Sequence, residues 1–250
     1  MSQHPAFNHL DHRPWPVPSH RWTWRQSWRD LLFAHWPVPA SELQPLVPPP
    51  LRVQEFEGTS WVGVVPFRMA GVMRRPLPDL PYFSAFPELN LRLYVEYQDR
   101  PGVWFLSLDA ANIFAVWAAR RFFHLPYFHA RMSLAGSPDR IQYRSYRLSA
   151  PRGIAFEGSY APCGETYQSV AGSLEHWLTE RYCLYARSPR GHLFRAEVHH
   201  QPWPLQPAEA SIERNDLLVP HGIELPEMPP LVHFSRRIDV VVWSPEAIAT

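Results

Sequence analysis

The sequence contains no lysine, although it carries 24 basic residues in a chain of 250. All of these basic residues are arginine, whose guanidinium stays protonated in proteins. Lysine is the side chain that can lose its proton and attack a carbonyl group as an amine. Any enzyme built from this chain must therefore work without a Schiff base on an internal side chain, whatever caused the bias toward arginine.

An excess of charge of one sign is also missing, because the 24 basic residues are balanced by 23 acidic residues. A formal net charge of +1 provides no broad positive potential that would collect a polyanion, so we predict that the protein does not bind nucleic acid. Hydrophobic residues make up 46% of the chain and charged residues 19%, which is typical of globular proteins and unlike a disordered chain. The chain is therefore expected to fold.

Cysteine is limited to Cys163 and Cys183, too few for a disulfide framework in a chain of this length. No apolar run is long enough to span a bilayer, and the first residues lack the apolar stretch of a signal peptide. These absences predict a cytoplasmic protein with no membrane contact. We expect one domain over residues 1–250, with residues 1–20 poorly ordered, and the sequence leaves open whether the chain forms a homo-oligomer.

Proline is frequent, and its 29 residues are spread over the whole chain, which favours short strands and turns over long helices. Apolar residues nevertheless recur at helical spacing in Trp24, Trp28 and Leu31, and the same stripe continues to His35. The expected helices cover residues 23–34, a short stretch capped by Ser41, a largely buried segment 110–123, and residues 174–181 with Ser173 as N-cap.

Most other segments are typical of strands, because they are rich in β-branched and aromatic residues and are bounded by turn signals. The expected strands cover residues 51–56, 60–67, 88–97, 103–108, 140–148, 182–186, 193–199 and 238–242. The first two should form a hairpin around Gly58, and the next two a second hairpin around residues 99–102. This balance predicts an α+β fold, β-rich and mostly antiparallel, with a few peripheral helices.

The segment from Glu88 to Val95 alternates strictly between polar and apolar residues. Successive side chains of a strand point to opposite faces, so Glu88, Asn90, Arg92 and Tyr94 share one face. Within about 20 Å of strand, this row could clamp a carboxylate with Arg92 and move a proton with Glu88. The alternative is a strand whose polar face is solvated, and the alternation alone slightly favours that simpler interpretation.

Three further residues have both a structural and a functional interpretation. His35 continues an apolar stripe, where a histidine is more often a core residue than a ligand-binding group. Arg181 follows the helix expected over residues 174–181, where an arginine commonly completes a helix C-terminus, and the alternative is a second anion clamp. Asp109 precedes the helix expected from Ala110, where an N-cap role explains the aspartate fully and a functional role is the less favoured alternative.

Motifs for metals and cofactors are missing. The sequence has no HExxH and no CxxC, and the adjacent His199 and His200 would face opposite ways on a strand. It also has no GxGxxG, no phosphate-binding P-loop and no GxSxG, which argues against dinucleotide binding, phosphoryl transfer and an α/β-hydrolase. We therefore predict that the protein uses neither a metal nor a cofactor.

Several blocks, taken in order, resemble the bacterial YqjF-like family of unknown function. The blocks are residues 28–36, 64–67, 86–95, 102–110, 125–127, 180–182 and 200–203. That family is similar in fold to acetoacetate decarboxylase, so the resemblance implies a β-rich cone or barrel with a buried pocket and an inward-facing row from Glu88. It also implies a match between Glu88 and the acidic strand residue of the decarboxylase pocket. The decarboxylase relies on a Schiff-base lysine, and no position here can supply one.

Three functions remain open at this point. The first is a buried pocket that binds an unidentified small molecule bearing a carboxylate or oxo group, with Asn90, Arg92, Tyr94, His35 and Arg181 as ligand-binding residues. The second is a lysine-independent lyase, isomerase or hydrolase in which Glu88 is the general base. The third is a protein interaction module whose tryptophans and prolines form a partner surface.

Overall fold

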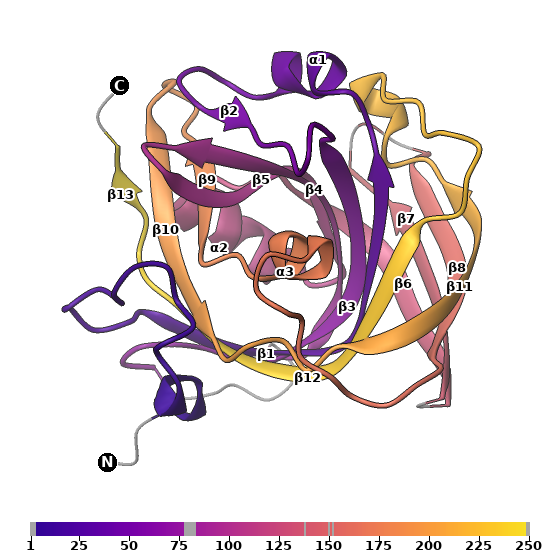
Figure 1. Ribbon diagram of the computed structural model, residues 1–250, viewed down its shortest axis with the longest axis horizontal. Helices are drawn as coiled ribbons and strands as arrows, with labels where there is room; N and C mark the ends of the chain where they lie inside the picture. The colour runs from indigo at the N-terminus through magenta and orange to yellow at the C-terminus, as the bar shows by residue number, and fades with distance from the viewer. Residues whose placement is uncertain (1–3, 78–83, 138, 150, 152, 249–250) are drawn as a thin grey trace.

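The computed structural model describes residues 4–77, 84–137, 139–149, 151 and 153–248, and most of them belong to one curved sheet (Figure 1). Its strands are β1 (Trp24–Pro37), β2 (Arg52–Val53), β3 (Trp61–Arg74), β4 (Phe86–Tyr97), β5 (Arg100–Ala110), β6 (Tyr127–Ser137), β7 (Arg140–Arg147), β8 (Ala155–Pro162), β9 (Cys183–Arg187), β10 (Leu193–His200), β11 (Gln206–Asn215), β12 (Leu231–Val242) and β13 (Glu246–Ala247). The helices are α1 (Ala40–Leu43), α2 (Ile113–Phe123) and α3 (Leu174–Thr179), with 3-10 turns η1 (Pro5–Asn8), η2 (Gln44–Leu46) and η3 (Val219–His221). Within the described residues, no helix has the length and apolar character needed to cross a membrane.

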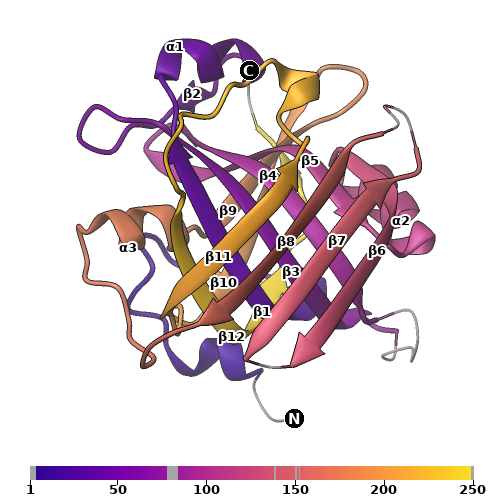
Figure 2. The ribbon, with the colours of Figure 1, turned by 90° about the vertical axis from the view of Figure 1, so that its right-hand side faces the viewer.

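Part of the sheet closes on itself. The pairings run β10, β9, β5, β4, β3, β1 and β12, and β12 then pairs with β10 again. Most of these pairs are antiparallel, and the ring is irregular because β1 and β4 contain register shifts. Figure 1 looks along the ring, and Figure 2 places α3 and α2 at its opposite ends. The expectation of a β-rich, mostly antiparallel α+β fold is confirmed.

Strands β6, β7, β8 and β11 form a second layer outside the ring (Figure 2). One hydrophobic core lies between the layers, where Leu89 and Leu91 of β4 belong to the same cluster as Tyr143 and Phe156. A second core lies inside the ring and includes Tyr94 from the opposite face of β4. The alternation along β4 therefore separates two cores, and the polar row faces into the ring instead of into solvent.

The expected helix over residues 23–34 is wrong, because this segment is the long strand β1. Asp30 has a positive φ of 51°, and the register against β3 shifts between Arg29 and Ala34. The extra residue of such a bulge resets the alternation of side chains. Trp28 and Leu31 consequently line the same interior. The bulge in the strand therefore gives the apolar residues a spacing that resembles that of a helix.

Of the other local predictions, some are confirmed and some are wrong. The hairpin of residues 88–97 with 103–108 is confirmed as β4 and β5, and Ser173 caps α3 by accepting a hydrogen bond from the His176 amide. The turn at Gly58 is present, because Phe56 and Thr59 form an antiparallel bridge across it, but the expected pairing of its flanking strands is wrong, because β2 pairs with β4 and not with β3. Helix α1 begins at Ala40 and has no side-chain cap, so Ser41 does not act as one.

Helix α2 is not the largely buried helix that was expected. Val116 is its buried residue, whereas Phe114 is 64% exposed and Trp117 is 62% exposed. Asn112, rather than Asp109, caps the helix by accepting hydrogen bonds from two backbone amides of its first turn. The helix covers one end of the ring, and the outer face of the helix is exposed to solvent.

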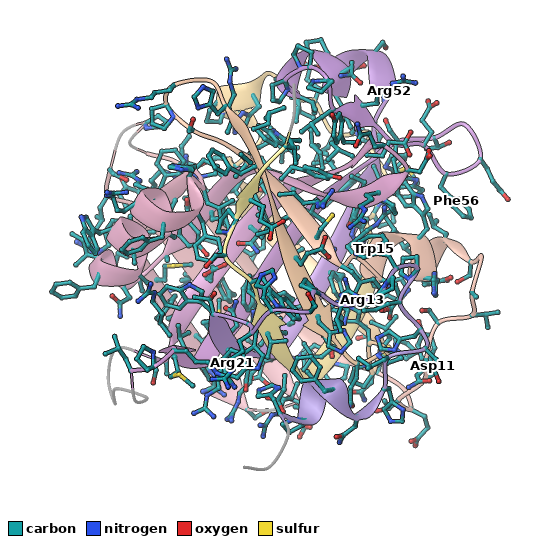
Figure 3. All side chains as sticks on the ribbon, turned by 90° about the vertical axis from the view of Figure 1, so that its left-hand side faces the viewer. Asp11, Arg13, Trp15, Arg21, Arg52 and Phe56 are labelled. Carbon is teal, nitrogen blue, oxygen red and sulfur yellow. The ribbon has the colours of Figure 1, made fainter. Side chains whose placement is uncertain are left out.

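Residues 4–20 belong to the segment expected to be poorly ordered, and several of them contact β10. Arg13 and Trp15 both donate hydrogen bonds to the carboxylate of Glu197, at 2.9 and 2.8 Å. The His199 ring bonds the carbonyl of Ala6 at 2.8 Å. Figure 3 shows the segment that carries Arg13 and Trp15 running across this side of the molecule. The N-terminal segment thereby covers the outer face of a ring strand.

Candidate functional site

A cavity of about 170 Å³ lies inside the ring and is lined by residues of both α2 and α3. Its wall is formed mainly by aromatic and aliphatic side chains that point inward from the ring strands. The aromatic members of this wall include Trp24, Trp28, Phe67, Phe86, Phe105 and Phe123. Glu88, Asn90, Arg92 and Arg181 interrupt the apolar surface. A few polar groups in an apolar concavity are typical of small-molecule sites.

Glu88 is 2% exposed and lies near the start of β4. Its carboxyl accepts a hydrogen bond of 2.9 Å from the Tyr127 hydroxyl. Burial raises the pKa of Glu88 to about 8, although hydrogen bonds from Tyr127 and Asn90 oppose the shift. At neutral pH this carboxyl group is therefore mostly protonated, and it can donate a proton to a molecule in the cavity.

Arg92 is held by a short chain of hydrogen bonds. Its Nε and Nη2 donate to the Tyr94 hydroxyl at 3.1 and 2.9 Å, and Nη2 also donates to the carbonyl of Leu178 at 3.1 Å. Because the hydroxyl oxygen of Tyr94 accepts hydrogen bonds from Arg92, the hydroxyl proton of Tyr94 points to His35 Nε2. The distance from the Tyr94 oxygen to this nitrogen is 2.6 Å. Burial and the charge of Arg92 hold the pKa of His35 well below its usual value, so this ring is neutral and can accept.

Gly63 makes this arrangement possible. It lies on β3 between the partners His35 of β1 and Arg92 of β4. A Cβ atom at this position would lie 3.1 Å from His35 Cδ2 and 3.3 Å from Arg92 Cγ. A larger residue would therefore press on both side chains, so Gly63 leaves the space in which they lie close together.

Arg181 supplies a second buried guanidinium. Its Nε donates to the carbonyl of Trp177 at 2.7 Å, and its Nη1 donates to the side chain of Gln54. Burial, with a smaller contribution from the charge of Arg92, lowers the pKa of Arg181 to about 10, which still leaves a cation at neutral pH. Among the described residues, no carboxylate lies within ion-pair distance of Arg92 or Arg181, in contrast to Arg13 and its partner Glu197.

Several buried polar atoms of the lining residues have no hydrogen-bond partner in the described part of the chain. The donors are Arg181 Nη2, Trp28 Nε1 and Trp203 Nε1, and the acceptor is Asn90 Oδ1. A buried donor or acceptor without a partner costs about 1 to 3 kcal/mol, so unmade bonds are rare in folded proteins. All four atoms belong to residues that line the same cavity, and the atoms themselves are fully buried.

A family model described as an uncharacterized conserved protein, DUF2071, matches residues 25–239. The chain belongs to the DUF2071 family. The uncharacterized protein YqjF of Bacillus subtilis (strain 168) is 45% identical over 227 residues, which cover 91% of this chain and 93% of YqjF. The resemblance to the YqjF-like family is thus confirmed.

Solved structures place this DUF2071 chain in the acetoacetate decarboxylase-like fold. The enduracididine biosynthesis enzyme MppR has a TM-score of 0.66 and 14% identity, covering 91% of this chain and 88% of that one. Acetoacetate decarboxylase from Legionella pneumophila has a TM-score of 0.64 and 13% identity, covering 100% of this chain and 97% of that one. At such low identity the likeness shows the fold alone.

The structure brings some of the expected site residues of this DUF2071 protein together and separates others. Glu88, Asn90, Arg92 and Arg181 all line the cavity. Tyr94 and His35 belong to the chain of bonds behind Arg92 rather than to the cavity wall. Glu88 and Arg92 have separate partners, because Glu88 accepts a hydrogen bond from Tyr127, whereas Arg92 donates to Tyr94 and to the carbonyl of Leu178.

The two adjacent histidines do face opposite ways, as their spacing on a strand predicts. His200 lines the cavity, and His199 bonds the N-terminal segment. Within the described residues, no group of three His, Cys, Asp or Glu side chains could hold a metal ion. Beside the two guanidinium groups, the polar side chains that line the cavity include Glu88, Asn90, Tyr127 and His200.

Sequence reasoning missed Tyr127, Trp28 and Trp203 as members of the site. Tyr127 is 39 residues from its partner Glu88, and the ring of Trp203 stacks on that of Trp28 at 5.8 Å. The blocks at residues 125–127 and 200–203 that carry the family resemblance include Tyr127 and Trp203. That resemblance was the signal that could have indicated them.

Proposed function

We propose that the cavity binds a small molecule bearing a carboxylate or oxo group, whose anionic end is bound by Arg92 and Arg181. The observation that carries the proposal is the pair of buried guanidinium groups without a carboxylate partner among the described residues. A buried charge is strongly unfavourable unless it is paired, and an anionic ligand would supply the missing charge. Planar guanidinium groups also match the two oxygens of a carboxylate.

Two further observations support this assignment. The cavity volume of about 170 Å³ is comparable to engineered cavities of about 150 Å³ that hold benzene, so it suits a molecule of that order of size. A solved structure of MppR, which shares the fold, is a complex with pyruvate, a small oxo acid. The cytoplasm remains the compartment that we propose for such a ligand-binding protein.

A second candidate function is a lysine-independent lyase, isomerase or hydrolase in which Glu88 transfers the proton. The pKa of about 8 for Glu88 favours it, because a carboxyl group tuned near the working pH is suited to proton transfer. At pH 7 the group acts first as an acid, rather than as the base that the sequence suggested. Removal of an α-proton from a bound oxo acid requires the ionised carboxylate, so exchange in deuterated water that increases as pH rises through about 8 and is lost in Glu88→Gln would favour this reaction class.

Calorimetric titration with small oxo acids tests the binding proposal. Pyruvate and its homologues should bind the intact chain, and Arg92→Gln or Arg181→Gln should weaken binding by about 10- to 100-fold through loss of a charged hydrogen bond. The control is Arg190→Gln, which changes an exposed arginine away from the cavity and should leave binding unchanged. The proposal is overturned if no small carboxylate binds at millimolar concentration, or if both cavity variants bind like the control.

A further inference from the structure

The cavity is divided into a charged half and an apolar half. Both guanidinium groups are anchored at α3, since Arg92 donates to the carbonyl of Leu178 and Arg181 to that of Trp177. Figure 2 shows α2 at the end of the ring opposite α3. Polar contacts for an anion are therefore concentrated at one end of the cavity.

The opposite end is closed by one face of α2. Ala115, Ala118, Ala119 and Phe123 line the cavity, and their spacing of three, four and eight residues puts them on a single helical face. Phe86 from β4 lines the same interior, and so does Trp24, whose ring lies 6.0 Å from that of Phe123. This half presents methyl groups and aromatic rings, and none of these six residues is charged.

The two halves are too far apart for a very short acid to contact both. Phe86 and Arg92 both line the cavity, and they are six residues apart on β4. An acid of three carbons that touches the guanidinium groups would leave the alanine face of α2 without a partner. A ligand that fills the cavity needs an apolar part that extends from its carboxylate toward α2.

We infer that the ligand of this site is a carboxylic or 2-oxo acid with a branched aliphatic or aryl tail, its carboxylate at Arg92 and Arg181 and its tail against the alanine face of α2. The inference rests on the proposed function and narrows it to a chemical class. Small alanine side chains on α2 set the length of tail that fits. Glu88 and Asn90, between the two ends, lie opposite the carbon atoms that join the carboxylate to the tail.

The test compares two oxo acids with the same head group, pyruvate and 4-methyl-2-oxopentanoate, by calorimetric titration of the intact protein. The second acid adds three carbons, and each buried carbon contributes about a fourfold gain in affinity, so it should bind about 50-fold more tightly. Ala118→Leu should fill the tail end and reduce the affinity for the longer acid by at least 10-fold. The same variant should leave the affinity for pyruvate unchanged.

Trp117→Leu is the matched control, because Trp117 is on the outer face of the same helix and does not line the cavity. It should leave both affinities unchanged. Equal affinities for the two acids in the wild-type chain would overturn the inference and leave the proposed function intact, and this comparison stands even if Ala118→Leu does not fold. Absence of binding by both acids would instead remove the proposed function and the inference with it. An equal loss of affinity for both acids in Ala118→Leu would show that the tail does not lie against α2.

Discussion

At the scale of single residues, Glu88 is the side chain whose chemistry the fold changes most clearly. The same carboxyl group would ionise near pH 4.5 in water, and inside the ring its pKa is about 8. The cause is desolvation, which disfavours the charged form and which the hydrogen bond from Tyr127 only partly offsets. Because no cation lies within ion-pair distance of this carboxyl group in the described structure, the proton itself removes the charge.

This proton predicts how stability depends on pH. Between about pH 4.5 and pH 8 the folded state keeps a proton that the unfolded state has lost, so the free energy of unfolding should fall as pH rises through this window and level off above it. The shift corresponds to a contribution on the order of 3 to 5 kcal/mol, because each pKa unit is worth about 1.36 kcal/mol. Glu88→Gln removes this contribution, which urea unfolding at several pH values can measure. Glu209→Gln, an exposed change on β11, should retain the wild-type pH profile, and parallel profiles for all three proteins would refute the raised pKa.

At the scale of elements, one buried ion pair joins the ring to the outer layer. Asp109 of β5 and Arg147 of β7 are separated by 2.7 Å between Oδ1 and Nη2, and both side chains are 1% exposed. Strands β5 and β7 have β6 between them, so the pair braces two strands that are not hydrogen-bonded to each other. The expected N-cap role of Asp109 was wrong because β5 continues to Ala110 and the helix starts later.

Removing one member of this pair should be costly, since the other charge remains buried without a partner. Asp109→Asn is expected to lower the free energy of unfolding by about 3 to 5 kcal/mol. Glu157→Gln breaks the exposed pair with Arg144 and should cost about 0 to 1 kcal/mol, so it serves as the control. Urea midpoints of both variants give the comparison. Equal midpoints would mean that the buried pair contributes no more than a surface pair.

At the scale of the whole molecule, the ring and the composition together limit the chemistry. Proteins of the acetoacetate decarboxylase-like fold include enzymes, and this chain shares their architecture over nearly its whole length. The interior here offers guanidinium, carboxyl, amide and indole groups and no amine, because the chain has no lysine. An imine on an internal side chain is therefore excluded for this family member.

Reductive trapping checks this limit on the intact protein. Borohydride added in the presence of acetoacetate or a 2-oxo acid should leave no covalent adduct on any internal side chain, because an imine requires a primary amine. Mass spectrometry of the digested protein locates any adduct that forms. Trapping on a lysine-dependent decarboxylase under the same conditions is the positive control, and an adduct at an internal residue would contradict the prediction.

The sequence by itself determined the chemistry that is absent and the local pattern of the site. It excluded the imine, because that depends only on residue type, and the strict alternation from Glu88 placed four polar side chains on one face. The cap at Ser173 and the hairpin of β4 and β5 were also predicted, since both depend on residues close together in the chain. The family resemblance supplied the inward direction of the row.

The tertiary structure decided everything that depends on residues distant in sequence. Strand β1 is extended because β3 and β12 pair with it on both sides, and those hydrogen bonds override a helical spacing that a bulge at Asp30 produces. Arg92 lacks a carboxylate because Tyr94 and the carbonyl of Leu178, 86 residues away, take its hydrogen bonds. The local sequence pattern alone predicts that this polar face contacts water. Closure of the ring instead makes the face part of the wall of a cavity.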